Sequence, residues 1–235
     1  MSDDGSQKIR VALPRGQELH RLVEHFGRVG FALEALAEDA RFVEGGDPLD
    51  SGFDFEFVTL SPSDVGTYVE FGICHAGVLS TDLIGESEFK VWRPFTFNFG
   101  SYPLVLVGWR GQTLNTLMAK PVLRLATPIP RFTKEWFTTR GIPTEVVPVV
   151  NDASIAVILG LTDCWVDQLT NPEEVVAAGF RVVETMGQTY LKLVVNPAAA
   201  SGRRTAIRQL ISALEEQNPP PGPRISIPFD LDDPL

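Results

Sequence analysis

Short apolar runs alternate along this chain with segments whose apolar residues recur every three or four positions. Residues 9–13 form a run of the first kind, and the next segment places Leu22, Val23 and Phe26 on one helical face. Gly30 is a suitable C-terminal cap for that helix. Alternating strands and helices fold into parallel strands joined by crossover helices, so the sequence predicts an α/β protein.

The alternation continues to about residue 217. Apolar or alternating runs predict further strands at residues 54–60, 77–80, 102–108, 124–127, 145–149, 164–167 and 190–195. Helical spacing and capping residues predict helices after residues 61–63 and 81–82, and at residues 131–140, 153–159, 173–178 and 203–217. We expect strand 190–195 to pair with strand 102–108 where the chain passes between its two halves.

Composition argues against several classes of function. The chain has 20 basic and 30 acidic residues, and its net charge of -10 repels a nucleic-acid backbone. Its apolar stretches fall far short of the roughly 20 residues that cross a bilayer, and residues 1–7 do not resemble a signal peptide. Cys74 and Cys164 lack disulfide or zinc spacing and are expected to be buried thiols. We therefore expect a cytoplasmic protein that binds neither nucleic acid nor membrane.

Four stretches are similar, in order and spacing, to the catalytic chain of the short-form ATP phosphoribosyltransferases. They are IRVALPRG, SPSDVGTYVEFG, RLATPIPRFTKEWFTTRGI and GLTDCWVD, at residues 9–16, 61–72, 124–142 and 160–167. Together with residues 190–196 they cover most of the chain from residue 9 to about residue 215. The ordered set is more specific than any one of its motifs.

The resemblance implies a two-lobed α/β fold of the type II periplasmic-binding-protein kind, with a central cleft for substrates. Lobe I would comprise residues 1–100 and 188–217, lobe II residues 101–187, and residues 218–235 a tail rich in Pro and Asp. The implied reaction joins ATP to phosphoribosyl pyrophosphate with Mg²⁺ and releases pyrophosphate, in the first step of histidine biosynthesis. The resemblance also implies an oligomer that works with a regulatory subunit resembling a histidyl-tRNA synthetase. Such a displacement depends on positioning and charge stabilisation, so we assign no catalytic side chain.

The substrate loop departs from the pattern of that family. The family grips the phosphoribosyl group with an acidic residue and a Thr-Gly-x-Thr turn, whose backbone N–H groups suit a phosphate. Here Asp167 is followed by Gln168-Leu169-Thr170-Asn171-Pro172-Glu173-Glu174. Pro172 replaces the glycine and removes a donor, and the two glutamates add negative charge where a phosphate would lie. The same residues form an ordinary helix start, with Asn171 as N-cap and Pro172 at the first helical position.

The candidate substrate-binding residues come from three loops. Arg15 and Gly16 follow the first strand and could hold a phosphate; the alternative is a surface arginine at a tight turn. Asp82 could lie beside the cleft, although helix capping is its simpler role. Asp167 could contact ribose hydroxyls or Mg²⁺, or be a solvated carboxylate before a loop. The remaining members of the set are Thr170, Asn171, Glu173 and Glu174.

Other polar side chains are interpreted as structural. The spacing of the histidines does not suit a metal site, and we predict no site built from metal ligands of the protein. The basic side chains on the helix at residues 131–140 are better explained by a solvated face than by a nucleotide contact. The residues in question are His20, His25, His75, Arg131, Lys134 and Arg140.

Two functional hypotheses remain open. The first is an active ATP phosphoribosyltransferase that uses Arg15 and the loop at residues 167–174. The second is a catalytically silent paralogue that binds a small ligand or a partner subunit through the same cleft. Pro172, Glu173 and Glu174 motivate the second hypothesis, because they disfavour a phosphate at the altered loop.

Overall fold

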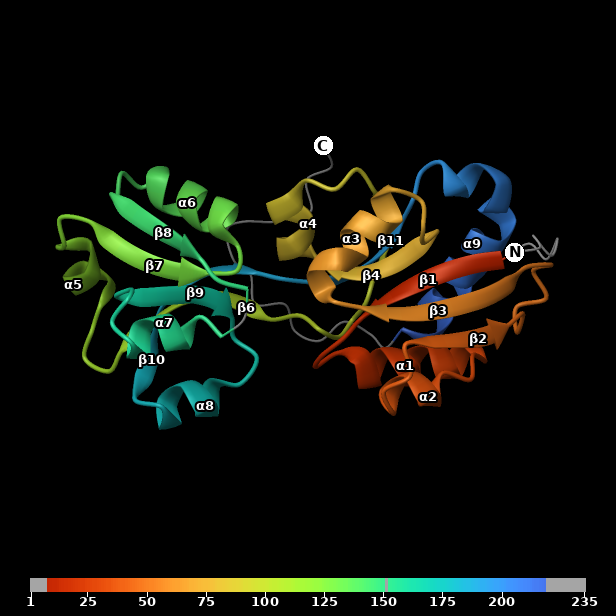
Figure 1. Ribbon diagram of the computed structural model, residues 1–235, viewed down its shortest axis with the longest axis horizontal. Coiled ribbons are helices and arrows are strands. Elements are labelled where there is room, and N and C mark those ends of the chain that lie inside the picture. Colours follow the sequence, from red (N-terminus) through yellow and green to blue (C-terminus); the bar gives the residue numbers. More distant parts are fainter. Residues whose placement is uncertain (1–7, 151, 219–235) are drawn as a thin grey trace. The chain divides into compact units, whose positions relative to one another are not determined.

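The computed structural model describes residues 8–150 and 152–218, and the chain divides into two compact units (Figure 1). Unit 1 runs to Gly100 and resumes at Tyr190, and unit 2 is Ser101–Thr189. Each unit is built around its own sheet and has its own apolar core. The tail expected from residue 218 lies, beyond Asn218, outside the described residues. The α/β fold with two lobes that the sequence predicts is confirmed.

The described part of unit 1 forms a six-stranded sheet in the order β2-β3-β1-β4-β11-β5. The parallel strands are β1 (Lys8–Pro14), β3 (Asp54–Leu60) and β4 (Ala76–Ser80). The antiparallel additions are β2 (Phe42–Gly46) beside β3, β11 (Leu191–Val195) beside β4, and β5 (Trp92–Thr96) beside β11. Because β1, β3 and β4 run in one direction, the loops that follow them share one edge of the sheet.

The helices of unit 1 cover both faces of this sheet (Figure 1). They are α1 (Leu19–Val29), α2 (Glu34–Ala37), α3 (Pro62–Glu70), α4 (Thr81–Ser87) and α9 (Ala199–Gln217). Side chains alternate along β1, so Val11 packs into the core shared with α1 and α9, and Ala12 into the core beneath α3 and α4. Burial on both faces explains why β1 is apolar almost throughout.

The described part of unit 2 forms a five-stranded sheet in the order β10-β6-β9-β7-β8. Its strands are β6 (Pro103–Trp109), β7 (Leu123–Thr127), β8 (Thr144–Pro148), β9 (Cys164–Gln168) and β10 (Phe180–Gln188). β7, β8 and β9 are parallel, and β6 and β10 are antiparallel to their neighbours.

Short helices cover the two faces of the sheet in unit 2. They are α5 (Leu114–Met118), α6 (Pro130–Thr138), α7 (Ser154–Ile158) and α8 (Pro172–Ala177). Phe137 of α6 packs with Leu106 on one face, whereas Val157 of α7 packs with Val105 on the other. None of the helices within the described ranges combines the length and apolar character that a membrane span needs.

Two predictions about the strands are wrong. β11 lies between β4 and β5 in unit 1, with Leu193 opposite both Val78 and Phe95, and does not pair with β6. β6 instead lies between β9 and β10, and the sequence predicts no strand at the position of β10. The register of β10 shifts between Val182 and Glu184 and again farther along the strand, so its side chains lack the regular alternation that reveals a strand.

Candidate functional site

The turn at Arg15 and Gly16 lies at the carboxyl edge of the parallel strands in unit 1. The backbone N–H of Arg15 donates to the Leu60 carbonyl oxygen at 2.8 Å, and its Nε donates to Thr59 Oγ1 at 3.2 Å. Gly16 has a φ of 109°, a backbone conformation that residues with a side chain rarely adopt. A Cβ added at this position would meet no other atom within 4 Å. Backbone conformation, and not crowding, therefore favours glycine there. The turn is held against the end of β3 while the Arg15 side chain remains exposed.

Asp82 lies beyond the carboxyl end of β4, in the first turn of α4. The N-cap position belongs to Ser80, whose side chain makes no capping hydrogen bond, and Asp82 is the acidic residue of the first turn. Asp82 is buried at 6% exposure, near the positive end of the helix dipole. Thr81 exchanges two hydrogen bonds with Tyr190, at 2.9 and 3.0 Å, which joins this helix start to the residue before β11.

The loop after β9 contains the helix start that the sequence predicts. Asn171 is the N-cap of α8, and its Oδ1 accepts a hydrogen bond from the Glu174 backbone N–H at 3.4 Å. Its Nδ2 donates to Glu174 Oε1 at 2.7 Å. Pro172 is the first helical residue, and Glu173 and Glu174 occupy the first turn. The donor that a phosphate would use at Glu174 is therefore already bonded to a side chain of this chain.

Asp167 is at the end of β9, before that loop. Its Oδ1 accepts a hydrogen bond from the Gln168 backbone N–H at 2.7 Å. The Leu169 N–H donates to the Pro103 carbonyl oxygen at 2.8 Å, which continues the ladder between β9 and β6 beyond the strand. The loop thus leaves the sheet only at Thr170, so Asp167 is positioned by the sheet and the next residues by the capped helix.

A pocket of about 320 Å³ adjoins this loop on unit 2. The predicted site residues Thr170, Asn171 and Glu174 line it, whereas Asp167 and Glu173 do not. The sheet contributes Trp165 and Phe180, whose rings meet edge to face at 4.7 Å between centroids. Loops at the carboxyl ends of parallel strands are the usual position of ligand sites in α/β proteins.

Asp152 and Ser154 also line the pocket, although the sequence did not single them out. The Ser154 backbone N–H donates to Asp152 Oδ1 at 3.0 Å at the start of α7. Asp152 and Ser154 follow the carboxyl end of β8, which is parallel to β7. That position in the sequence could have marked them as candidate site residues. Of the described residues that line the pocket, Asp152 and Glu174 are acidic and none is basic. An anionic ligand therefore needs a cation to accompany it into this pocket.

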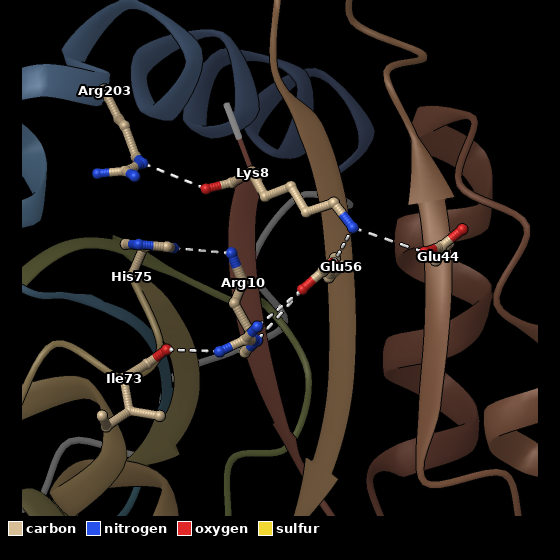
Figure 2. A network of polar contacts seen from close by, with 7 residues as sticks. All are labelled: Lys8, Arg10, Glu44, Glu56, Ile73, His75 and Arg203. Atoms are coloured by element: carbon tan, nitrogen blue, oxygen red, sulfur yellow. Dashed lines mark hydrogen bonds and ion pairs between the residues drawn. The ribbon is translucent and has the colours of Figure 1, made fainter. Parts of the chain in front are cut away.

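A polar network lies at the amino ends of β1, β3 and β4, away from the loops described above (Figure 2). Glu56 is buried and accepts hydrogen bonds from Lys8 Nζ at 2.6 Å and Arg10 Nη2 at 3.0 Å. The Arg10 backbone N–H donates to His75 Nδ1 at 2.8 Å. Burial, with smaller contributions from the charges of Arg203 and Arg10, lowers the pKa of His75 to about 4. A neutral His75 accepting a backbone N–H agrees with a structural role.

The other side chains interpreted as structural also have packing partners or solvent contact. His25 is buried between the rings of Phe97 and Phe99, at centroid distances of 5.5 and 5.4 Å. Arg140 stacks over Trp136 with its guanidinium carbon 3.7 Å from the ring centroid. Arg131, Lys134 and His20 are exposed on α6 and α1.

The fold and these loops define the class: a two-lobed α/β protein of the periplasmic-binding-protein type. The ATP phosphoribosyl transferase (HisG:HisZ) complex from Thermotoga maritima contains a chain of the same fold. It has a TM-score of 0.73 and 22% identity, and the match covers 89% of this chain and 98% of that one.

Sequence comparison identifies the family. The family model of HisG, ATP phosphoribosyltransferase, matches residues 61–216. The ATP phosphoribosyltransferase of Deinococcus deserti is 31% identical over 214 residues, which are 90% of this chain and 94% of that protein. The one from Thermus thermophilus is 30% identical over 88% of this chain and 96% of its own length. This chain belongs to the ATP phosphoribosyltransferase family, as the four motifs predict.

Proposed function

We propose that this chain joins ATP and phosphoribosyl pyrophosphate to give phosphoribosyl-ATP and pyrophosphate, the first step of histidine biosynthesis. The observation that carries the proposal is the 31% identity to an ATP phosphoribosyltransferase over 90% of this chain. A likeness of that extent includes the loops of both units. Fold alone would not justify an activity, because one fold hosts many functions.

In unit 1 we assign phosphate binding to Arg15 and Gly16. The Arg15 Nε is held by Thr59, and no hydrogen bond from its terminal Nη nitrogens occurs within the described residues. A guanidinium fixed at one nitrogen loses less freedom when its other donors bind a phosphate. Asp82 belongs to the same edge, and we propose that its carboxylate orients the α4 start beside the substrate.

In unit 2 we assign Asp167 to the ribose hydroxyls and Thr170 and Asn171 to the phosphoribosyl phosphate. The Asn171–Glu174 contact occupies one donor of the helix start, so the binding must rely on the residues before Pro172. Glu173 and Glu174 would oppose a bare phosphate. The Glu174 carboxylate, together with that of Asp152, lines the pocket and favours a substrate that carries a cation.

The acidic pocket fits Mg²⁺ that arrives with the substrate. Within the described residues no three His, Cys, Asp or Glu side chains gather as a metal cage. Mg²⁺ is commonly held by one or two carboxylates together with substrate phosphates, and Asp152 and Glu174 are such carboxylates. The bound ion would neutralise phosphate charge as pyrophosphate leaves.

Two further assignments accompany the activity. The Thermotoga relative was solved as a HisG:HisZ complex, and we propose that this chain also works with a separate regulatory subunit. We also propose a cytoplasmic location. Cys74 and Cys164 are both buried and free, and burial raises the pKa of Cys74 to about 11, which agrees with a reducing compartment.

The first test is thermal unfolding with phosphoribosyl pyrophosphate plus Mg²⁺, and separately with ATP, followed by a turnover assay of pyrophosphate release. Ligand at a hundred times its dissociation constant stabilises the folded state by about 2.7 kcal/mol, so protection is readily measured. Protection that is lost in Arg15→Ala but kept in Arg131→Ala would support the assigned site. Absence of protection by either substrate would contradict the proposal and favour the silent paralogue.

A further inference from the structure

A second pocket, of about 380 Å³, lies on unit 1 between helix α9 and the start of strand β5. We call it the α9 pocket. A volume of this size suits a small molecule. The described residues that line it are Trp92, Pro197, Arg204, Ile207 and Arg208, and the residues that we assign to the substrates are not among them.

The α9 pocket lies at the amino ends of the parallel strands of unit 1. Strand β5 begins at Trp92, which pairs with Val195 at the end of β11, and Val195 in turn pairs with Ala76 at the start of β4. Arg15 and Asp82 follow the carboxyl ends of β1 and β4. The pocket is therefore on the opposite edge of the sheet from the substrate residues proposed for unit 1.

The charge of the α9 pocket is opposite to that of the chain. Its described lining includes two arginines and no acidic residue, although the net charge of the chain is -10. Residues 199–214 of α9 contain three arginines and neither Asp nor Glu. The pocket beside α8 has the reverse composition, so an anion is favoured in the α9 pocket without an accompanying cation.

The two arginines of the pocket have no structural partner that would explain them. Arg203 Nε donates to the Lys8 carbonyl oxygen at 3.2 Å (Figure 2). Arg204 and Arg208, in contrast, make no hydrogen bond or ion pair within the part of the chain that the structure describes. They are four residues apart on one face of α9, a spacing at which like charges weaken a helix. A phosphate or carboxylate between them would relieve this repulsion and accept hydrogen bonds from both guanidinium groups.

The apolar side of the pocket is formed by Trp92 and Ile207. Ile207 is 1% exposed and belongs to the core of unit 1, whereas Trp92 is 47% exposed. A half-exposed indole beside a pocket offers a flat surface on which a ring can stack. The pocket thus combines two cationic groups with a flat apolar surface.

We propose that the α9 pocket binds a small organic anion in which a flat ring carries a phosphate or a carboxylate group. The anionic group lies between Arg204 and Arg208, and the ring lies against Trp92. An inorganic anion would make only the first of these contacts, and an uncharged ring only the second. This inference does not depend on the proposed function, because the two sets of residues do not overlap.

Calorimetric titration of the full chain with four probes tests the proposal. Phenyl phosphate and benzoate carry both a ring and an anionic group, inorganic phosphate lacks the ring, and phenol is uncharged. Phenyl phosphate or benzoate should bind at least about tenfold more tightly than inorganic phosphate and phenol, because only the first two make both contacts. The order of phenyl phosphate and benzoate then identifies the anionic group that the pocket prefers.

Variants locate the binding. Arg204→Ala combined with Arg208→Ala should weaken phenyl phosphate binding at least about tenfold. The matched control, Arg131→Ala combined with Lys134→Ala, removes the same two charges from exposed positions of α6 and should change the affinity less than about twofold. Trp92→Leu should weaken phenyl phosphate binding but leave inorganic phosphate binding unchanged. Circular dichroism melts check that each variant is folded.

Arg15→Ala separates this site from the proposed substrate site. Phenyl phosphate should bind to Arg15→Ala as it does to the wild type, whatever the catalytic activity of the chain. Binding that is lost in Arg15→Ala, or lost equally in the α9 and α6 double variants, would overturn the proposal. A wild type that shows no saturable binding of phenyl phosphate or benzoate at millimolar concentration would also overturn it.

Discussion

Replacing Glu56 with Gln tests the energetic role of the network in Figure 2. The Glu56 side chain is 5% exposed and receives Lys8 Nζ at 2.6 Å and the Arg10 guanidinium at 3.0 and 3.3 Å. Loss of one partner from a fully buried ion pair costs about 3–5 kcal/mol. Here Lys8 and Arg10 are each 40% exposed and can regain water, so we expect Glu56→Gln to lower the free energy of unfolding by about 2 kcal/mol.

Urea unfolding at pH 7 measures this loss as a lower midpoint at constant m-value. The matched control is Glu145→Gln, whose partner Arg124 lies 3.0 Å away but whose side chain is 57% exposed, so we expect a change below about 0.5 kcal/mol. A Glu56 variant as stable as that control would refute the reasoning.

The free energy of unfolding of the wild type and that of Glu56→Gln should depend differently on pH. Burial would raise the pKa of Glu56, but hydrogen bonds from Lys8 and Arg10 outweigh it and hold the pKa below the ordinary value of 4.5. The unfolded chain then binds a proton more readily, so the stabilisation is present above pH 4.5 and is lost as the pH falls through the folded value. The difference in unfolding free energy between wild type and Glu56→Gln should therefore narrow as the pH falls through the pKa of Glu56 in the folded protein. A difference that persists well below that pKa would contradict a stabilising role for the ionised Glu56 carboxylate.

Three further changes test the α8 loop and the core. Asn171→Ala removes the N-cap of α8 and should cost about 1 kcal/mol, seen as faster amide hydrogen exchange in α8 and a lower urea midpoint. Gly66→Ala places a Cβ 2.1 Å from the Phe89 ring, so it should destabilise by about 1–3 kcal/mol in thermal unfolding; an unchanged melting temperature would show that the ring moves freely. Glu173→Gln removes a negative charge from the exposed first turn of α8 and so relieves a screened repulsion of about 0.5 kcal/mol. Calorimetry should then show phosphoribosyl pyrophosphate binding about twofold tighter. The control Glu145→Gln should leave the affinity unchanged.

Much of the substrate loop could be predicted because its structure is local. Asn171, Pro172 and Glu174 specify a capped helix start through contacts three residues apart, and the structure shows that cap. Gly30 similarly ends α1 in the left-handed conformation that its sequence suggests. Neither feature depends on which distant segment packs nearby.

The pocket and the strand partners were decided only by tertiary structure. Asp152 precedes the loop at residues 167–174 in the sequence and Phe180 follows it, and both line the pocket with Glu174. No local sequence pattern connects these three residues. Likewise, the apolar pattern of residues 190–195 reveals a strand but not its neighbours, β4 and β5, which lie about a hundred residues earlier. Helix caps and periodicity are set by interactions within a few residues. A strand's partners and a pocket's walls are chosen by which buried surfaces of the whole chain can pack together.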